Sequence, residues 1–421
     1  MYIKNYNQLA SNDHRKVVLD LIETAFSSIQ PENVLSKNFT LKDKILQIKD
    51  KKEDLGKYKR VFLLGFGKGS GGISQIIEGI LGEFLTEGFV IDVIPQSFKK
   101  IEFSLGTHPL TSSQNVDFTN KVLSKLSDLT PDDLVLVVIC GGGSAMFESS
   151  SLPLDKIIEV NKMLLQSGAD IFELNTIRKH LSKVKGGQLA KLLYPSKVFS
   201  LIFSDVLGND LSTIASGPTV RDKTIIDDAL QIYKKYKMEN ILKPEDFSET
   251  PKKESFFEKL ENILMVSNIT ALDAMQKRAK ELGFTSFIYS EKFQGEAKVS
   301  GKTLLDASKP NSVLLCGGET TVKVKGEGQG GRNQELVLGA LPYIKKGVVI
   351  ASFDSDGWDN SSAAGALGDF QTLKRVEDFK LNPLDFLENN NSFMFFQKVG
   401  DSIQTGKLPS NVSDLMIVLN A

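Results

Sequence analysis

The sequence predicts an α/β protein with two domains and a cleft between them. The first domain would be a Rossmann-like, mostly parallel sheet flanked by helices, and the second a smaller mixed-sheet α/β domain. Three observations support this prediction. Apolar strands run directly into glycine turns and helices, 421 residues suit two or three domains of roughly 150 residues, and a charged, proline-containing stretch over 223–262 is typical of a connection. We therefore expect domains over residues 1–245 and 255–421.

Composition limits the classes of function. Hydrophobic residues make up 41% of the chain, and 51 basic against 52 acidic residues give a formal charge of -1. Because the charges nearly cancel, composition does not indicate binding to nucleic acid or to an anionic membrane. The expected substrate is therefore small. Cys140 and Cys316 each follow an apolar run and precede Gly-Gly, which favours small buried side chains over a disulfide. With no apparent signal peptide or membrane span, the sequence predicts a cytoplasmic protein.

The first 60 residues are predicted to be helical scaffold, because apolar residues between Val17 and Ala25 recur at helical spacing. The charge run over 49–54 would be a solvated face of this scaffold. The segment Val61-Phe-Leu-Leu64 then has the pattern of a buried strand. It leads into the glycine turn Gly65-Phe-Gly-Lys-Gly-Ser-Gly-Gly72 and a helix from Ile73, an arrangement that binds phosphate in many α/β proteins.

Two chemistries fit this first turn. Gly67, Gly69 and Gly72 satisfy G-x-G-x-x-G, and Asp92 follows about 20 residues later, as a dinucleotide site requires. Lys68 lies inside the turn, where a dinucleotide fingerprint needs no charge but a phosphoryl-transfer site does. The alternative for Lys68 is a solvent-facing loop residue.

A second glycine turn repeats the device. The apolar run Leu134–Cys140 lacks alternation, which indicates a parallel strand buried on both faces. Gly141, Gly142, Gly143 and Ser144 follow it with exposed N–H groups and a hydroxyl, at the strand end where ligands bind in open α/β sheets. Between the two turns, His108 precedes Pro109, where it could contact substrate or cap the next helix.

Charged residues follow in two further places. A helical segment carries Arg178, Lys179, Lys183 and Lys185, and the Gly186-Gly187 tail indicates that part of this basic face points inward. Next, the strand over 198–203 ends near two acidic residues. Acidic groups at a strand end could hold Mg²⁺ or accept a hydroxyl proton, with helix capping as the competing role. These two residues are Asp205 and Asp210.

The expected second domain opens near Ile263 and is organised around one stretch. An apolar strand ends at Gly317-Gly318-Glu319, Val and Lys alternate over 322–325, and a glycine loop delivers Arg332 to the start of a helix. Helix N-terminal amides and an arginine fork both favour an anion. Three carboxylates crowded after a later strand would face this arginine or a metal, unless they form a plain acidic turn. They are Asp354, Asp356 and Asp359.

Taken together, the motifs resemble the class II glycerate kinases, also called glycerate 2-kinases, with their MOFRL-type C-terminal domain. The ordered set covers the chain from about residue 60 to its end, and its specificity lies in the order rather than in any one motif. It comprises Gly65-Phe-Gly-Lys-Gly-Ser70, Gly106-Thr-His-Pro109, Cys140-Gly-Gly-Gly-Ser-Ala145, Asn175-Thr-Ile-Arg-Lys-His-Leu-Ser182 with Lys185-Gly-Gly187, Ser204-Asp-Val206 with Ser216-Gly-Pro218, Gly317-Gly-Glu-Thr-Thr-Val322 with Gly330-Gly-Arg-Asn-Gln-Glu335, and Asp356-Gly-Trp-Asp359 with Ala363-Ala-Gly365.

The resemblance implies ATP- and Mg²⁺-dependent phosphorylation of D-glycerate, most simply at the 2-hydroxyl, giving 2-phosphoglycerate in sugar-acid degradation. It maps the family's essential lysine onto Lys68 and its essential arginine onto Arg332, with Asp205 as a third catalytic candidate. Metal candidates are Asp205 and Asp210, and a homodimer is one option for assembly. The candidates for binding substrate or nucleotide are Gly67, Ser70, His108, Gly142, Gly143, Ser144, Arg178, Asp210, Glu319, Asn333 and Asp356.

The sequence departs from the family pattern in three places. Gly208-Asn209-Asp210 stands where Gly-Asp-Asp is usual, Asn360 follows Asp359 in place of glycine, and the threonine-glycine loop near the end is reduced to residues 405–412. These differences bear on metal ligation and loop shape rather than on the reaction class. Two alternatives remain: an NAD(P)-dependent hydroxypyruvate reductase, motivated by the glycine fingerprint, and a ligand-binding sensor without catalysis.

Overall fold

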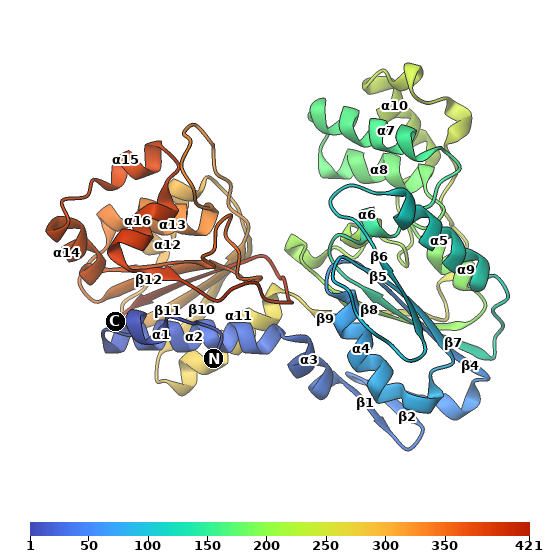
Figure 1. Ribbon diagram of the computed structural model, residues 1–421, viewed down its shortest axis with the longest axis horizontal. Helices are drawn as coiled ribbons and strands as arrows, with labels where there is room; N and C mark the ends of the chain where they lie inside the picture. Colours follow the sequence, from blue (N-terminus) through green and yellow to red (C-terminus); the bar gives the residue numbers. More distant parts are fainter. The chain divides into compact units, whose positions relative to one another are not determined.

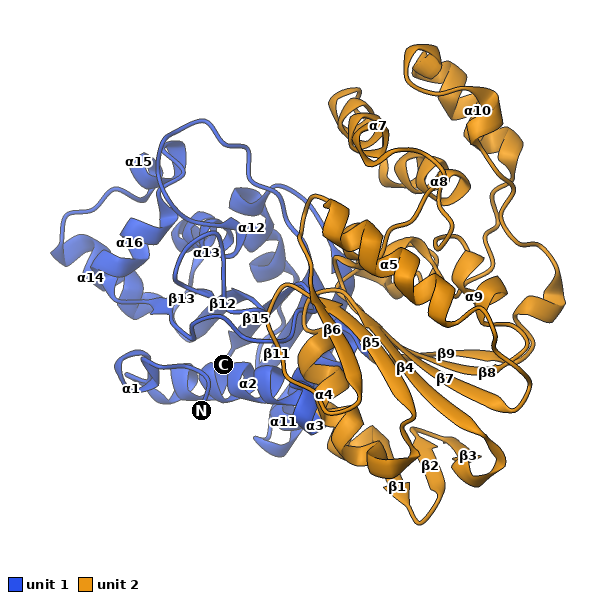
Figure 2. Cartoon of the chain, turned by 45° about the vertical axis from the view of Figure 1, so that its right-hand side comes forward, with its two compact units in different colours: residues 1–33, 266–421 blue, residues 34–265 orange.

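The computed structural model describes all 421 residues (Figure 1). The chain forms two compact units, coloured separately in Figure 2. Unit 2 comprises residues 34–265, and unit 1 comprises residues 1–33 together with 266–421. Unit 1 is therefore built from two distant parts of the chain. No helix in either unit has both the length and the apolar character needed to span a bilayer.

Unit 2 is organised around a six-stranded sheet with the strand order β6-β5-β4-β7-β8-β9. All the pairings from β6 across to β8 are parallel. All seven residues of β7 are buried, which confirms the two-faced burial that its unbroken apolar run predicts. The strands are β4 (Arg60–Phe66), β5 (Glu87–Asp92), β6 (Ile101–Leu105), β7 (Asp133–Ile139), β8 (Lys197–Phe203) and β9 (Leu260–Val266).

The strand order creates a switch point between β4 and β7. From β4 the chain adds β5 and β6 on one side, and then returns to add β7, β8 and β9 on the other. The connections on the two sides diverge there, and the carboxyl ends of strands at such a point are the usual ligand position in open α/β sheets. Both predicted glycine turns follow these two strands.

Helices cover both faces of this sheet. Alternate residues of β4 and β7 share a hydrophobic core with α5 (Ser113–Lys125), α6 (Gly143–Met146) and α9 (Gln188–Leu193), while α4 (Ser70–Leu81) also packs on β4, β5 and β7. A separate core joins α7 (Leu154–Gln166), α8 (Ile171–Leu181) and α10 (Ile226–Lys235). The stretch over 223–262, expected to be a connection, thus contributes a packed helix to unit 2 and ends in the edge strand β9.

The N-terminal segment is only partly helical. Three helices, α1 (Tyr6–Leu9), α2 (Asp13–Ile29) and α3 (Pro31–Asn38), precede a small antiparallel sheet of β1 (Phe39–Lys42), β2 (Ile45–Ile48) and β3 (Lys51–Asp54). The prediction of helix over 39–54 was therefore wrong. Tight turns at Asp43 and Lys49, which have φ of 55° and 52°, fold the segment into hairpins, so the charge run forms an edge strand.

Unit 1 contains a mixed six-stranded sheet with the order β10-β11-β15-β12-β13-β14. Only β10 and β11 pair in parallel, and the other pairings are antiparallel. The mixed sheet expected for the second domain is thus confirmed. Its strands are β10 (Thr285–Phe293), β11 (Ser312–Gly318), β12 (Val348–Asp354), β13 (Gly365–Asp369), β14 (Ser402–Ile403) and β15 (Asp414–Asn420).

The unit 1 sheet lies between two helical layers (Figure 1). On one face α2 packs against α11 (Asn268–Glu281). The guanidinium of Arg15, on α2, is fully buried and pairs with Asp369 and Asp401 at 2.6 Å each, which fixes the N-terminal helix to this sheet. The remaining helices are α12 (Ala297–Ala307), α13 (Arg332–Ala340), α14 (Phe370–Asp378), α15 (Pro383–Glu388) and α16 (Ser392–Val399).

The remaining local features are the two cysteines and several short 3₁₀ helices. Both cysteines are buried and unpaired, as predicted, and burial raises the pKa of the Cys316 thiol to about 12. The short 3₁₀ helices span Leu55–Lys57, Gly82–Phe84, Leu207–Asn209, Ile214–Ser216, Met238–Asn240, Pro244–Asp246, Glu254–Phe256 and Leu341–Tyr343.

Candidate functional site

The two glycine turns of unit 2 lie directly against each other at the switch point. The backbone N–H of Lys68 donates to the carbonyl of Gly141 at 2.8 Å. Gly67 has φ of 106°, and a Cβ there would lie only 2.4 Å from the Cys140 carbonyl oxygen. Glycine is required at position 67 for both reasons. The turn after β4 therefore brings Lys68 beside the turn after β7.

The ammonium of Lys68 has no partner within the protein. Its side chain is exposed and makes no ion pair or hydrogen bond. Its charge nevertheless reaches the neighbouring imidazole, because the pKa of His108 is lowered first by burial and then by Lys68. A cation held on a glycine turn without a counter-ion is suited to receive an anionic ligand.

Asp92 caps the helix that follows the first turn. Its carboxylate accepts hydrogen bonds from the backbone N–H groups of Gly69 at 3.2 Å and Gly71 at 2.9 Å, at the start of α4. Burial raises the pKa of Asp92. In a dinucleotide site these amides would face the pyrophosphate and the acidic residue would bind the ribose. The structure thus corrects the fingerprint interpretation: Asp92 serves the helix, and its carboxylate occupies the amides that a pyrophosphate would need.

Asp205 and His108 close over the second turn. A Cβ at Gly141 would lie 1.8 Å from Oδ2 of Asp205, and one at Gly142 would lie 2.8 Å from Cδ2 of His108. The peptide bond between His108 and Pro109 is cis. Lys68, His108 and Asp205, which are far apart in the sequence, therefore gather around the same pair of glycine turns.

A chain of polar side chains begins at the end of the second turn. The hydroxyls of Ser144 and Ser216 lie 2.9 Å apart, and Ser216 donates to Oδ1 of Asn175 at 3.0 Å. Ala215 and Ser216 both have positive φ, at 50° and 61°, which is strained for residues other than glycine. The sequence identified Ser144 as a candidate, whereas Ser216 and Asn175 entered only as parts of motifs. Gly143 permits this approach, since a Cβ there would lie 2.9 Å from Cβ of Ala215.

Two other candidates have local bonding roles. Ser70 is buried and its hydroxyl donates to the carbonyl of Ile91 at 3.1 Å, so it links α4 to β5. Asp210 is exposed and accepts from the backbone N–H of Ser212 at 2.9 Å, which forms a turn. No group of three or more His, Cys, Asp or Glu side chains in the chain is arranged to hold a metal ion.

Part of the basic face over 178–185 does point inward, as predicted, whereas Lys183 is exposed. Lys179 pairs with Asp222 at 3.1 Å, and Lys185, which is 1% exposed, pairs with Glu148. Arg178 donates to Oδ1 of Asn161 at 2.6 Å, and burial lowers its pKa. The charge of Glu148 raises the pKa of Arg178 in opposition to burial, so Arg178 belongs to the same buried network as Lys185.

Unit 1 holds a second cation, at the end of its own glycine loop. Three carboxylates surround the guanidinium of Arg332: Nε donates to Asp414 at 2.6 Å, one terminal nitrogen donates to Glu319 at 2.7 Å, and the other lies 3.6 Å from Asp354. Register explains the gathering, because Asp414 at the start of β15 pairs with Gly318 of β11 on one side and Asp354 of β12 on the other. Sequence reasoning missed Asp414, although an acidic residue that opens an otherwise apolar strand is a detectable signal.

Asp359 caps α13 in the same way that Asp92 caps α4. Its carboxylate accepts from the backbone N–H groups of Asn333 at 3.1 Å and Gln334 at 2.9 Å. The Asn333 side chain also donates to Asp414 at 2.8 Å and accepts from Ser352 at 2.5 Å. The expectation that the helix amides beside Arg332 are open to an anion was therefore wrong, since a buried aspartate occupies them.

The three crowded aspartates thus have different positions. Asp354 faces Arg332, Asp359 caps the helix, and Asp356 accepts from the backbone N–H of Trp358 at 2.9 Å within the turn. Burial is the main cause that raises the pKa of Asp354, and it raises the pKa of Asp414 to about 7 even though Arg332 acts in the opposite direction.

Comparisons with known proteins agree with this architecture. Residues 17–246 match a family described as a domain of unknown function (DUF4147), and residues 312–414 match the MOFRL family. The chain is 34% identical to the "Glycerate 2-kinase" of Picrophilus torridus over 99% of both chains. It is 33% identical to the "D-glycerate 2-kinase" of Thermotoga maritima over 96% of this chain and 98% of the relative.

Solved structures give the same result. A crystal structure described as glycerate kinase from Thermotoga maritima matches with a TM-score of 0.86 and 31% identity, over 96% of this chain and 99% of the other. Among the sequence relatives, a "Putative hydroxypyruvate reductase" of Agrobacterium vitis is 34% identical over 86% of this chain and 87% of the relative. The fold and the sites thus define a two-unit α/β protein with paired glycine turns. The chain belongs to the class II glycerate kinase family.

Proposed function

We propose that this protein transfers a phosphoryl group from ATP to the 2-hydroxyl of D-glycerate and releases 2-phosphoglycerate. The observation that carries the proposal is the unpartnered ammonium of Lys68 on paired glycine turns at the switch point. Membership of the family supplies the reaction class and the substrate. The near-zero net charge of the chain gives no indication of a large polyanionic partner, which agrees with a small substrate.

Lys68 and Arg332 would supply the positive charge. A loose transition state spreads negative charge over the phosphoryl oxygens, so positioning and charge neutralisation account for most of the rate enhancement. Lys68 would bind the transferred group, while Arg332, already oriented by Asp414 and Glu319, would present its remaining donors to an anionic ligand. The Gly142 and Gly143 amides and the Ser144 hydroxyl would hold a phosphate or the glycerate carboxylate.

The side chains around the turns have complementary roles. Asp205 would accept the proton of the attacking hydroxyl or orient Mg²⁺, with Asp210 as the other metal candidate. Mg²⁺ commonly binds one or two carboxylates and otherwise water and phosphate oxygens, so the absence of a ready-made cluster is compatible with an ion that enters with the nucleotide. A bound Mg²⁺ would neutralise charge on the phosphates. His108, whose pKa is lowered, would contact substrate as a neutral imidazole.

The direct test is product analysis. Purified protein is incubated with ATP, Mg²⁺ and D-glycerate, ADP release is followed, and the product is identified by ³¹P NMR. A 2-phosphoglycerate signal is expected. A 3-phosphoglycerate signal would retain the kinase but contradict the orientation of glycerate, and no ADP release would contradict the proposal. Cytoplasmic location and a homodimer stay predictions, which fractionation and light scattering would test.

The second candidate is an NAD(P)-dependent hydroxypyruvate reductase, favoured by the name of the Agrobacterium relative. The position of Asp92 argues against it, because that carboxylate already occupies amides at the start of α4. Oxidation of NADH or NADPH with hydroxypyruvate, without any need for ATP, would support the reductase and reduce Lys68 to a loop residue.

A further inference from the structure

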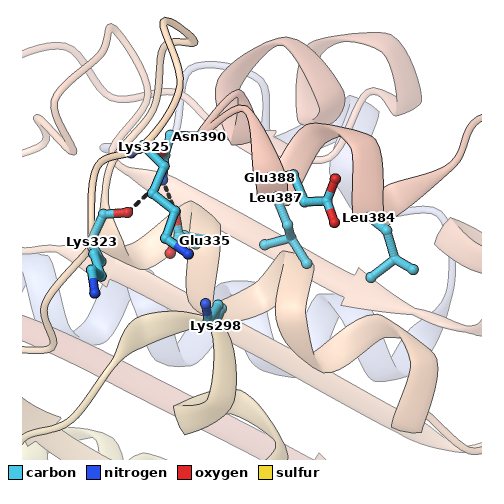
Figure 3. Close-up of a pocket in the computed structure, with 8 residues that line it drawn as sticks. All are labelled: Lys298, Lys323, Lys325, Glu335, Leu384, Leu387, Glu388 and Asn390. Carbon is cyan, nitrogen blue, oxygen red and sulfur yellow. Dashed lines mark hydrogen bonds between the residues drawn. The ribbon is translucent and has the colours of Figure 1, made fainter.

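Unit 1 contains a pocket of about 480 Å³ that the proposed reaction does not use. Figure 3 shows its two ends. Lys298, Lys323 and Lys325 gather at one end around Glu335, and Leu384 and Leu387 of α15 lie at the other. The pocket therefore combines a cationic end with an apolar end.

Two of the three lysines at the cationic end make no ion pair, and Lys298 acts together with their charges to lower the pKa of the nearby Glu296 carboxyl. Lys323 and Lys325 lie on the segment that follows β11, and both side chains line the pocket. Both are exposed, and neither makes an ion pair. Lys298 pairs with Glu296 at 2.9 Å. Two carboxyl groups also line the pocket: Glu388 lies on α15 with the leucines, and burial raises the pKa of Glu335.

Asn390 holds the cationic end in place. Its carbonyl oxygen accepts from the backbone N–H groups of Lys325 at 2.7 Å and Gly326 at 3.0 Å. Its amide nitrogen donates to the carbonyl of Lys323 at 3.3 Å and to the carboxyl of Glu335 at 3.2 Å. The segment that carries both lysines is thus ordered before any ligand arrives, which lowers the ordering cost of binding.

We propose that this pocket binds a small organic anion that carries a phosphate or two carboxylates on an apolar body. The charged group would lie between Lys323 and Lys325, and the apolar part would lie against Leu384 and Leu387. Charge-assisted hydrogen bonds to two unpaired ammonium groups would supply the specificity for a dianion. Leu384 is 59% exposed in the free protein. A ligand that covers this leucine surface would gain affinity from burying it.

The pocket adjoins the loop that leads to Arg332. Asn389 and Asn391 flank Asn390, and their side-chain oxygens accept from backbone N–H groups of that loop at 3.1 Å and 3.2 Å. A Cβ at Gly326 or Gly328 would lie 2.4 Å from atoms of Asn389. An occupied pocket would therefore further restrain this loop. This consequence, a changed KM or kcat, rests on the proposed function, whereas binding itself does not.

The binding test uses phenyl phosphate, a dianion with an apolar ring, and isothermal titration calorimetry on the full chain at low salt. The expected Kd is about 1 mM or lower, and the double variant Lys323→Gln with Lys325→Gln should weaken binding by about tenfold or more. The matched control is Lys345→Gln with Lys346→Gln, two exposed lysines of the same unit without ion pairs, which should leave Kd unchanged. Leu384→Asn should weaken phenyl phosphate but not inorganic phosphate.

Three outcomes would overturn the proposal. They are no binding by the wild type, equal weakening in the pocket and control variants, and loss of binding in Lys68→Ala alone, which would place the ligand at the glycine turns of unit 2. Because calorimetry reads binding without turnover, failure here leaves the proposed kinase activity standing. Conversely, a protein without kinase activity would still show the pocket's affinity.

Discussion

Lys68 in unit 2 and Arg332 in unit 1 both follow glycine-rich segments, but the protein holds the two cations in opposite ways. Lys68 is exposed and has no partner. Arg332 is surrounded by Asp414, Glu319 and Asp354. A lysine without a counter-ion presents its full charge to a ligand, whereas an arginine held by carboxylates has a fixed direction and must share its charge. The difference teaches that motif position alone does not define how a cation acts.

The two helix N-termini beside these cations are alike. Asp92 caps α4, and Asp359 caps α13, and both carboxylates accept from backbone N–H groups. Neither helix start therefore offers these amides to a phosphate. In both units the capacity to bind an anion falls on the side-chain cation and on the turn amides that remain.

The largest effect is expected for Lys68→Ala. Loss of an unpartnered cation from a phosphoryl-transfer site should lower kcat/KM by on the order of 10²-fold or more while stability stays nearly unchanged, because no internal contact is lost. ADP release with D-glycerate measures the rate. Lys52→Ala, an exposed lysine of β3 without an ion pair, is the control. Turnover within about twofold of wild type would remove Lys68 from the mechanism.

Arg332→Ala should affect both activity and folding, which would sharpen the contrast with Lys68. Removing the guanidinium leaves Asp414 buried without its main counter-charge, so the free energy of unfolding should fall by about 1–3 kcal/mol. Urea unfolding measures this loss. Adding Asp414→Asn should recover part of the stability but not the activity. If Arg332→Ala were as stable as wild type, the ion pairs between Arg332 and its three carboxylates would have no structural role.

The pH dependence of stability should depend on Asp414, one of the three carboxylates around Arg332. The pKa of Asp414 is about 7 in the folded protein, well above the usual carboxyl value. Between pH 4 and 7 the unfolded chain has lost this proton while the folded protein retains it, so stability falls as pH rises through that window and levels off above it. Relative to Asp414→Asn, the wild type should lose on the order of 1–3 kcal/mol between these limits. Parallel pH profiles of the two proteins would contradict a raised pKa.

The two caps should give the smallest effects and test the likeness between the units. Asp92→Ala should cost about 1 kcal/mol and Asp359→Ala about 2 kcal/mol, because Asp359 also accepts from the side chains of Asn333 and Gln334. Thermal unfolding monitored by circular dichroism measures both. Asp92→Asn, which keeps an acceptor, should lose less than Asp92→Ala. A larger loss of stability for Asp92→Ala than for Asp359→Ala would contradict this prediction.

The sequence by itself determined the elements whose signals are local. The apolar run of β7 predicted a doubly buried parallel strand, and the glycines around Lys68 and before Arg332 marked the turns that carry the two cations. Hydrophobic periodicity and glycine conformational freedom act over a few residues, so they can be read from a short window. The ordered motifs indicated the family, because their order along the chain can be recognised without knowledge of the fold.

Tertiary structure alone decided which distant residues meet. Asp414 joins Arg332 through the register of β15 between β11 and β12, and Asp92 reaches α4 because β5 lies beside β4. Arg15 pairs with Asp369 and Asp401, far along the chain, and so assigns residues 1–33 to unit 1. A carboxylate carries no local mark of its partner. Burial and strand register choose that partner, and they exist only once the sheets have formed.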